Sequence, residues 1–443
     1  MDLLTEAAAK DLAEKYGSPF YLIDVDKFSD NLDKITSSFS TIYPNVRFGY
    51  SYKTNYVPSI CKEAMRKHFY AEVVSELEYA LALRLGNDPE NIIFNGPVKK
   101  KALLIEAVAA GSLTNIDNIQ EIEFLETGVR KGIIDPALAK IGVRISIKIA
   151  KADGSSALQN GLDVGRFGFE QTEAVDAIKR IRKIGIEPIA LHGHASSSDR
   201  SAANFGIITS TLCQVRRENH LDKLEYINVG GGLFGDVPRS MIKNGVPSFE
   251  DYATSINSIL AADPWVLTNK PTLIVEPGVS VVADCVDFYT TICNIKKVSD
   301  KRFAVVDGSV YNIRPTMHSL KLPYVHVNAR EGSETFYKYD IVGSTCMEKD
   351  VMAQDADLSD LKVGDFVAFS NVGAYTLVMT PPFINLSPAI VLRSEGESLK
   401  QIRAAQTVDS FFNDYRDLDS TLGEQNAWVT SDLTQNYITK QPC

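Results

Sequence analysis

The sequence predicts a (β/α)8 barrel followed by a second domain built from β-strands. Two observations support this assignment. In the first part of the chain, apolar segments of strand length alternate with helical patterns, as in α/β proteins. From about Cys285 onward, β-branched and aromatic runs are separated by turn residues with little helical pattern, which favours strands. The 443 residues also exceed the usual size of a single domain.

Eight barrel strands are expected. They are Val46–Tyr52, Phe69–Val74, Asn91–Asn95, Leu113–Ile116, Ala139–Ile145, Pro188–Leu191, Tyr226–Val229 and Thr272–Val275. Helical patterns such as ELEYALALRLG lie between them, and eight such pairs over about 250 residues are typical of this barrel. A doubly wound open sheet is the alternative. The strand count, and the lack of GxGxxG after the first strand, disfavour it.

The predicted division places residues 27–284 in the barrel. Residues 1–26 and 285–443 are assigned to the β domain. The assignment of the N-terminal strand Ser18–Asp24 to this domain rests chiefly on the family resemblance described below. The polar tail after Tyr415 has no predicted fold.

The composition excludes several kinds of partner. A net charge of −10, without a long basic tract, argues against nucleic acid. No apolar run reaches the roughly 18 residues of a membrane span, and the first residues do not resemble a secretion signal. The six cysteines form no CxxC pair, which suits the cytoplasm. His192 and His194 occur without HExxH or grouped acids, so no metal site is expected.

The segment VRFGYSYKTNY carries the first candidate residue. It begins as a strand and ends at Lys53, just before a helix that starts near Pro58. A lysine in that place lies at the barrel end where catalytic groups gather. A single lysine is more often a surface residue, so the argument for Lys53 depends on the other strand ends.

Three other strand ends also carry polar or glycine residues. HGHASSSDRS, with His194 and Ser197, follows the sixth strand, and Gly230, Gly231 and Gly232 follow the seventh. Consecutive glycines let backbone N–H groups surround an anion, and phosphate sites in barrels lie beside strands seven and eight. A run of three glycines by itself is more often a flexible turn, and its position after the seventh strand makes the two interpretations about equal. Glu276 follows the eighth strand, where a carboxylate can also serve as a cap or an ion-pair partner.

An amine, an anion site and a carboxylate together are what pyridoxal 5′-phosphate requires. The amine forms a Schiff base, the loop holds the phosphate, and the acid pairs with the ring nitrogen. A sugar-phosphate aldolase with a lysine nucleophile is a weaker alternative, because it needs neither the carboxylate nor a large β domain.

The sequence resembles the fold-type III pyridoxal-phosphate decarboxylases, the diaminopimelate and ornithine decarboxylase family. The resemblance runs from about Tyr16 to Tyr415. Its motifs occur in family order: YSYKTN, AEVVSELE, IIFNGPVKK, TNIDN, VRISI, GRFGF, HGHASS, NVGGGLFG, EPG, VVDGSVYNIRP, GSTCMEKD and NVGAY. It implies a pyridoxal-phosphate-dependent amino acid decarboxylase that acts as a homodimer with shared active sites.

The resemblance also implies individual roles. Lys53 would carry the cofactor as a Schiff base, His194 would stack on its ring, and Glu276 would pair with the ring nitrogen. The phosphate would be held by Ser197, Gly230, Gly231, Gly232 and Tyr375. Cys346 would reach the site from the partner subunit and control protonation, and Arg314 would bind a substrate carboxylate.

Glu276 favours decarboxylation over racemisation. A carboxylate keeps the ring nitrogen protonated and the cofactor a strong electron sink. The alanine racemases of the same fold resemble this chain less, with an arginine at the ring nitrogen and a tyrosine as second base. A racemase and a catalytically silent relative remain the alternatives, although a silent copy would not need to keep Lys53, Glu276 and Cys346 together.

Three positions depart from the family pattern. Val279 stands where the family has arginine after EPG, Met347 where an acid follows the cysteine, and His318 where many members have tyrosine. Glu348 lies one place beyond Met347, and a shift of one residue redirects a side chain. The hypothesis is therefore a modified, larger or carrier-tethered substrate, as in natural-product or siderophore assembly.

Overall fold

The computed structural model describes residues 4–150, 156, 158, 162, 164–195, 197, 199–242, 245–328, 336–380 and 382–413. The predicted tail after Tyr415 lies outside these residues. The chain divides into two compact units. The barrel unit comprises Lys27–Val237 and Asn244–Ala283, and the β unit comprises Met1–Asp26, Pro238–Lys243 and Asp284–Cys443.

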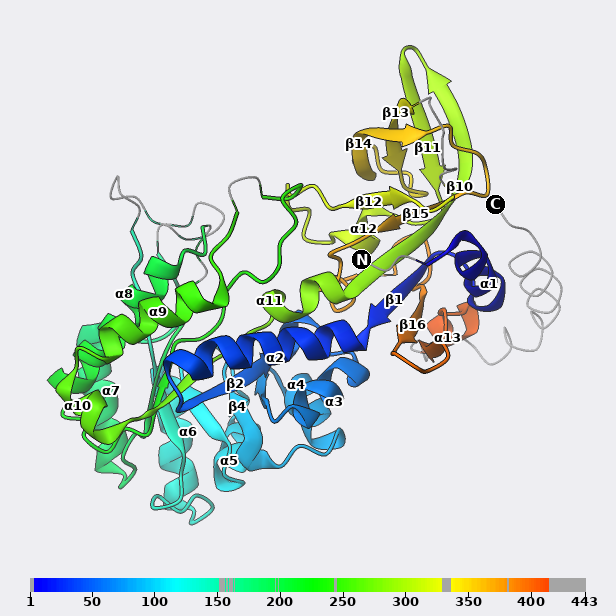
Figure 1. The fold of residues 1–443 in the computed structure, drawn as a ribbon. Helices are drawn as coiled ribbons and strands as arrows, with labels where there is room; N and C mark the ends of the chain where they lie inside the picture. The colour runs from blue at the N-terminus through cyan, green and yellow to red at the C-terminus, as the bar shows by residue number, and fades with distance from the viewer. Residues whose placement is uncertain are drawn as a thin grey trace, which may run out of the picture. The chain divides into compact units, whose positions relative to one another are not determined.

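Eight parallel strands close the barrel, so the predicted (β/α)8 fold is confirmed (Figure 1). In order they are β2 (Val46–Ser51), β3 (Tyr70–Val73), β4 (Ile92–Phe94), β5 (Leu113–Ile116), β6 (Ile141–Ile145), β7 (Ala190–Gly193), β8 (Tyr226–Asn228) and β9 (Thr272–Val275). Each strand pairs with the next along the chain, and β2 pairs with β9. Because all eight run the same way, their carboxyl ends meet at one rim.

Helices follow the strands and begin at recognisable signals. They are α2 (Val25–Ile42), α3 (Pro58–Arg66), α4 (Glu76–Arg84), α5 (Lys101–Ala109), α6 (Ile119–Arg130), α7 (Gln171–Lys183), α8 (Ala202–Glu218), α9 (Phe249–Leu260), α10 (Pro264–Asn269) and α11 (Val279–Val282). Pro58 occupies the first turn of α3, where its missing N–H costs nothing. Ser75 caps α4 by accepting from the N–H of Glu78 at 3.2 Å.

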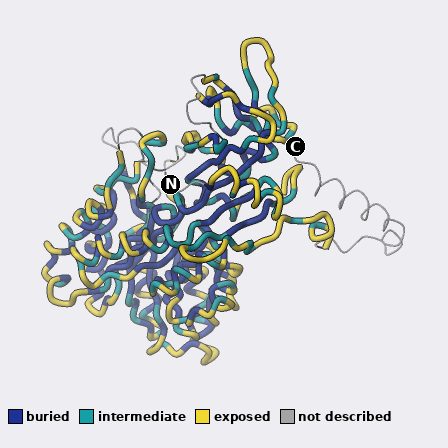
Figure 2. Tube along the Cα trace, turned by 45° about the vertical axis from the view of Figure 1, so that its right-hand side comes forward, coloured by how far each residue is buried: buried dark blue, intermediate teal, exposed yellow. Residues whose placement is uncertain are grey.

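The barrel strands are buried on both faces, as the dark segments of Figure 2 show. Helices cover the outside, so the strands read as nearly continuous apolar runs. Ile93, Leu113, Ala190 and Ile274 form one buried cluster within the barrel. The apolar interior leaves the strand ends as the place where polar side chains gather.

The β unit is a mixed sheet, so the predicted second, all-β domain is confirmed. Its strands are β1 (Phe20–Asp24), β10 (Val286–Val298), β11 (Lys301–Val306), β12 (Tyr324–His326), β13 (Phe336–Val342), β14 (Val351–Ser359), β15 (Phe366–Phe369), β16 (Ala389–Arg393) and β17 (Lys400–Arg403). The main order is β14-β13-β11-β10-β1-β16-β17, and β15 joins β10 to β12. The N-terminal β1 therefore lies between β10 and β16.

In the described residues of this unit, three helices accompany the sheet: α1 (Glu6–Tyr16), α12 (Val310–Ile313) and α13 (Val408–Phe412). Leu12 of α1 packs in a core with Phe20 and Tyr289, whose rings stack at 5.1 Å. Among the helices of the described segments, none combines the length and apolar character needed to cross a bilayer.

Replacing Gly142 of β6 by alanine should destabilise the barrel. A Cβ there would lie 1.9 Å from Oδ1 of Asn115 and 3.0 Å from Cβ of Ala190. We expect the free energy of unfolding in urea to fall by about 1–3 kcal/mol. Gly165→Ala is the control, because its Cβ would meet only Leu158 at 3.9 Å. Equal stability of the two variants would contradict the close approach at Gly142.

Candidate active site

Each of the eight barrel strands supplies at least one buried polar side chain at or just beyond its carboxyl end. These residues are Ser51, Glu72, Asn95, Asn115, Arg144, His192, Asn228 and Glu276. All are at most 7 % exposed. Buried polar groups are tolerated where they satisfy one another, so this polar rim is expected to be a connected network.

Lys53 lies at this rim on a short 3-10 turn, η1 (Tyr52–Thr54), directly after β2. The N–H of Ser51 donates to the carbonyl of Pro277 at 3.0 Å, and the hydroxyl of Tyr50 donates to the carbonyl of Asn55 at 2.8 Å. These bonds fix the backbone on both sides of the lysine. Its side chain remains 35 % exposed, so the amine can be reached by a ligand.

The amine of Lys53 forms a close ion pair with Glu72. Nζ lies 2.5 Å from Oε2 of Glu72 and 2.6 Å from Oγ of Ser51. The hydroxyl of Ser51 in turn donates to the same carboxylate oxygen. The ammonium is therefore held by the side chain of the neighbouring strand β3.

Glu276 receives its hydrogen bonds from two amides. Nδ2 of Asn95 and Nδ2 of Asn228 donate to Oε1 at 2.8 and 2.7 Å, and Nε2 of His192 lies 3.5 Å from Oε2. Burial favours the neutral acid, but His192, Lys53 and the amide of Asn228 outweigh it and lower the pKa of Glu276. The carboxylate is thus ionised in a buried setting.

The glycine run adopts backbone conformations that other residues resist. Gly230 and Gly232 have φ of +68° and +102°, in the left-handed range that favours glycine. A Cβ at Gly231 would lie 2.1 Å from the carbonyl oxygen of Glu276. The N–H of Gly230 donates to Oδ1 of Asn228 at 2.9 Å, which connects this loop to the acid.

His194 and Ser197 lie beside the glycine loop in the barrel unit. Nδ1 of His194 accepts from the N–H of Gly231 at 3.1 Å. Burial, followed by the charges of Arg144 and Lys53, lowers the pKa of His194 to about 3. The ring is therefore neutral at physiological pH. Ser197 accepts from the N–H of Arg200 at 3.1 Å and from Nδ2 of Asn204 at 2.9 Å.

Arg144 adds a buried cation to the rim. Its NH1 donates to Oδ1 of Asp117 at 3.1 Å, and its guanidinium lies 4.7 Å from the ring centre of Phe167. A nearby pair is also buried: Nζ of Lys99 lies 3.0 Å from Oε2 of Glu121. The positive charge of Arg144 is one reason why His194 stays neutral.

The barrel site fits pyridoxal phosphate. Three features lie on one rim: an accessible amine, a glycine loop with positive φ values, and an ionised acid that accepts hydrogen bonds from amides. Within the described part of the chain, no group of three or more histidine, cysteine, aspartate or glutamate residues could hold a metal ion. This donor set suits an organic phosphate with a protonated ring nitrogen.

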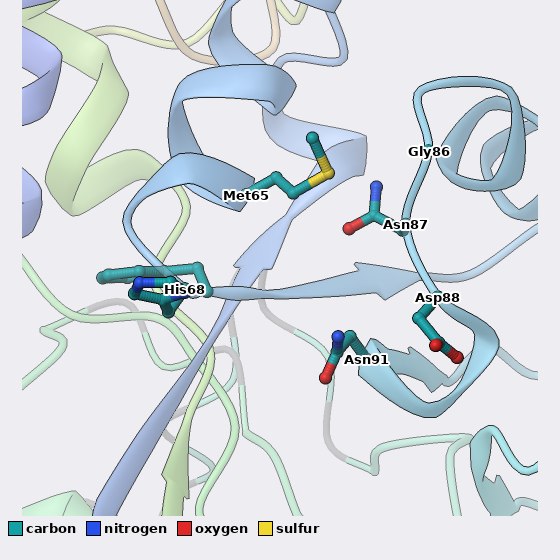
Figure 3. A pocket seen from close by; sticks show the side chains of 7 residues that line it. Met65, His68, Gly86, Asn87, Asp88 and Asn91 are labelled. Carbon is teal, nitrogen blue, oxygen red and sulfur yellow. The ribbon is translucent and has the colours of Figure 1, made fainter.

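The structure also contains a cavity of about 200 Å³ away from this rim (Figure 3). It is lined by Met65, His68, Phe69, Gly86, Asn87, Asp88 and Asn91. None of the polar rim residues lines it. We therefore assign it no part in the chemistry.

The other expected residues belong to the β unit. Cys346 is exposed and lies on the segment between β13 and β14. The carboxylate of Asp350 holds this segment in place through hydrogen bonds. Oδ1 of Asp350 accepts from the N–H of Val310 at 2.7 Å, and Oδ2 accepts from the N–H and hydroxyl of Thr345 at 3.1 and 2.6 Å. A Cβ at Gly343 would lie 2.3 Å from this carboxylate, so glycine leaves the space that Asp350 fills.

Arg314 follows α12 and is held by backbone carbonyls. NH1 donates to the carbonyl of His318 at 3.2 Å, and NH2 donates to that of Val351 at 2.9 Å. Burial lowers the pKa of His318, with Arg314 as the second cause, so its ring is neutral. Tyr375 is half-buried with a φ of +56°, a strained conformation often found at functional positions. Glu348 is exposed.

Comparison with known proteins assigns the chain to a family. Residues 29–283 match the family model of the pyridoxal-dependent decarboxylases, pyridoxal binding domain. The chain belongs to this family. It is a pyridoxal-phosphate-dependent amino acid decarboxylase, a carbon–carbon lyase, and the expected resemblance is confirmed.

Relatives of the decarboxylase align along nearly the whole chain. The diaminopimelate decarboxylase of Methanothermobacter thermautotrophicus is 26 % identical over 89 % of this chain and 91 % of its own. The L-glutamyl-(BtrI acyl-carrier protein) decarboxylase of Niallia circulans is also 26 % identical, over 92 % and 95 %. The structure of the diaminopimelate decarboxylase of M. jannaschi has the same fold, with a TM-score of 0.82, 24 % identity and coverage of 93 % and 95 %.

Sequence reasoning missed part of the decarboxylase's polar rim. Glu72, Asn95, Asn115 and Asn228 were not predicted as site residues, although each contacts another rim residue. The available signal was a single polar residue at the end of an apolar strand. Lys53, His194, the glycine loop and Glu276 were expected at this rim, and they lie in the one barrel unit.

The neutrality of His194 predicts a pH dependence of stability. Because its folded pKa lies near 3 and its unfolded pKa near 6.5, only the unfolded chain binds this proton between those values. Stability should therefore fall as pH drops below 6.5, by up to about 1.4 kcal/mol per pH unit from this residue. In cofactor-free protein, His194→Gln should flatten the plot of unfolding free energy against pH. A slope equal to that of the wild type would contradict a neutral ring at His194.

Removing Asp350 should destabilise the segment that carries Cys346. In Asp350→Ala, the donors of Val310 and Thr345 lose a buried acceptor, so the free energy of unfolding in urea should fall by about 3 kcal/mol. Asp357→Asn, which alters an exposed carboxylate 3.9 Å from Lys338, should change it by less than about 0.5 kcal/mol. Equal losses in both variants would show that Asp350 does not fasten the segment.

Proposed function

We propose that this decarboxylase acts on a modified, larger or carrier-tethered amino acid, in a natural-product or siderophore-type pathway. The supporting observation concerns Met347, which follows Cys346. The hydroxyl of Tyr311 donates to its sulfur at 3.0 Å, and the ring of Tyr311 packs edge-on against Phe383 at 5.5 Å. A thioether backed by aromatic rings offers an apolar surface. It cannot neutralise the distal ammonium of lysine, ornithine or diaminopimelate.

Arg314 is proposed to bind a carboxylate of the substrate. Its hydrogen-bond partners in the described residues are the carbonyls of His318 and Val351, which orient the guanidinium without neutralising its charge. Burial lowers the pKa of Arg314, as expected for a guanidinium that is partly buried with no carboxylate of the described residues beside it. His318 adds a neutral ring beside it. The predicted site therefore favours an anionic or acyl group over an amine.

We assign the barrel residues the roles that their geometry supports. When bound, pyridoxal phosphate supplies an electron sink for the electron pair left as carbon dioxide departs. Lys53 would attach the cofactor through its amine, and Glu276 would keep a negative charge at the ring nitrogen. His194 would present a neutral ring face. The loop Gly230 to Gly232, with Ser197 and Tyr375, would bind the phosphate. The N–H groups of Gly230 and Gly231 donate to Asn228 and His194, so the N–H of Gly232 would be the backbone donor.

We further propose a cytoplasmic homodimer in which Cys346 serves the partner's site. Its thiol is exposed and would return a proton to the reacting carbon. Val279 brings no charge to the phosphate end of the site, so Ser197, Tyr375 and the N–H of Gly232 would contribute more to phosphate binding. The reducing cytoplasm would keep the exposed thiol in its active form.

The relatives support either kind of substrate. Those aligned over most of the chain include diaminopimelate decarboxylases, and the Niallia circulans relative is named for a glutamyl group carried on an acyl-carrier protein. A glutamyl carrier substrate has no distal ammonium. Met347 at the position of the usual acid makes this second kind the better match.

A substrate panel tests the proposal. Carbon dioxide release from free diaminopimelate, ornithine and lysine, followed by mass spectrometry, should be at least about a hundredfold slower than from an acylated or carrier-linked amino acid, because Met347 leaves an ammonium unpaired. Rapid formation of lysine from meso-diaminopimelate would overturn the substrate assignment. A product that keeps its carboxyl group would indicate racemisation.

Cofactor attachment is tested separately. Lys53→Ala should abolish the yellow colour of the purified enzyme and lower turnover by at least about a thousandfold. Lys67→Ala is the control, because Lys67 pairs with Asp33 on the surface. Colour retained in Lys53→Ala would remove Lys53 from the proposed role.

A further inference from the structure

Asn95 lies between the two carboxylates of the barrel rim. It follows β4 directly and is 3 % exposed. Its Nδ2 donates to Oε1 of Glu72 at 2.9 Å and to Oε1 of Glu276 at 2.8 Å. Its backbone N–H donates to the carbonyl of Val73 at 2.8 Å, so the residue is anchored to β3. One neutral side chain therefore contacts both the partner of Lys53 and the proposed ring acid.

The orientation of the Asn95 amide is determined by its neighbours. An ionised carboxylate can accept hydrogen bonds but cannot donate them. The side-chain nitrogen of Asn95 must therefore face Glu72 and Glu276. The oxygen then accepts from Nδ2 of Asn115 at 2.7 Å. All the hydrogen-bonding groups of the side chain are engaged, and the two N–H bonds go to different carboxylates.

A neutral donor matters here because both carboxylates are buried. Glu72 and Glu276 are 1 % and 4 % exposed, and two carboxylates that share a buried site tend to raise the pKa of one of them. Asn95 gives each an N–H without adding charge. An aspartate of the same shape would replace both donors by acceptors and place a third carboxyl group between them.

The connection extends to the glycine loop. Oε1 of Glu276 also accepts from Nδ2 of Asn228 at 2.7 Å, and Oδ1 of Asn228 accepts from the N–H of Gly230 at 2.9 Å. A continuous set of hydrogen bonds therefore joins the amine of Lys53, through Glu72 and Asn95, to the acid and the loop.

We propose that Asn95 is a positioning residue that couples the Lys53–Glu72 ion pair to Glu276 by donating one N–H to each of the two buried carboxylates. This inference rests on the proposed function, because it gives the coupling a purpose at the cofactor. The bridge links the attachment point of the cofactor to its ring acid, and a change of charge at one end is transmitted to the other.

The first test titrates the visible absorbance of the cofactor-loaded enzyme against pH. Asn95→Asp should raise the midpoint by about one pH unit, which is tenfold in proton affinity. Asn118→Asp is the matched control: Asn118 caps α6 outside the bridge, and aspartate caps as well as asparagine, so no shift is expected. Midpoints in Asn95→Asp equal to those of the wild type and the control would overturn the proposal.

Asn95→Ser provides a second variant if the aspartate protein does not fold. A hydroxyl has one donor and can serve only one carboxylate, so it should shift the midpoint in the same direction by less. An unshifted midpoint in the serine variant would also overturn the proposal.

The second test uses cofactor-free protein and measures acetylation of Lys53 by mass spectrometry. Added negative charge next to Glu72 should favour the ammonium and slow acetylation in Asn95→Asp by about tenfold, while a surface lysine such as Lys67 reacts unchanged. An unchanged rate at Lys53 would contradict the coupling. If the wild type binds no cofactor but its Lys53 responds to Asn95→Asp, the proposed function fails and the bridge stands.

Discussion

Two buried carboxylates on one barrel rim are the constraint around which the site is built. Taking a carboxylate out of water is costly unless charges and hydrogen bonds replace the solvent. Glu72 is balanced by the ammonium of Lys53, and Glu276 by His192 and two amides. The polar residues at the other strand ends supply these donors. The amine of Lys53 and the carboxylate of Glu276 can therefore remain charged at the same end of an otherwise apolar barrel.

The barrel architecture explains how residues distant in sequence come together. Asn95 and Glu276 are separated by 181 positions, yet their side chains are 2.8 Å apart. Parallel strands bring all eight carboxyl ends to one rim, so each βα segment can contribute one side chain. The glycine loop after β8 lies beside the end of β9 for the same reason, and the N–H of Glu276 donates to the carbonyl of Gly230 at 2.9 Å. Glu276 and the glycine loop are thus joined directly by a backbone hydrogen bond.

The strands and the candidate residues were predictable to different degrees. All eight barrel strands follow from apolar segments of the right length, and Lys53, His194 and Glu276 from their places at strand ends. Asn95 and Glu72 could not be assigned in the same way, because an isolated polar residue beside an apolar strand has many possible roles. Only the distances reveal that one asparagine serves two acids. The role of Asp350 could not be predicted from the sequence either, because its four hydrogen-bond donors come from segments about 40 and 5 residues away.

Polar side chains in the β unit have different hydrogen-bond partners from those at the barrel rim. At the rim, the buried carboxylates are balanced by a lysine, a histidine and neutral amides. In the β unit, Arg314 is held by two carbonyl groups and Met347 accepts from a tyrosine hydroxyl. Carbonyl dipoles fix the direction of a guanidinium but leave its net charge available, and a thioether accepts weakly and carries no charge. If these residues bind the substrate as proposed, they would discriminate between substrates by the chemical group at the distal end. An ammonium would lose water without gaining a counterion, while a carboxylate would gain one at Arg314 and an acyl chain would lose little against Met347 and Phe383.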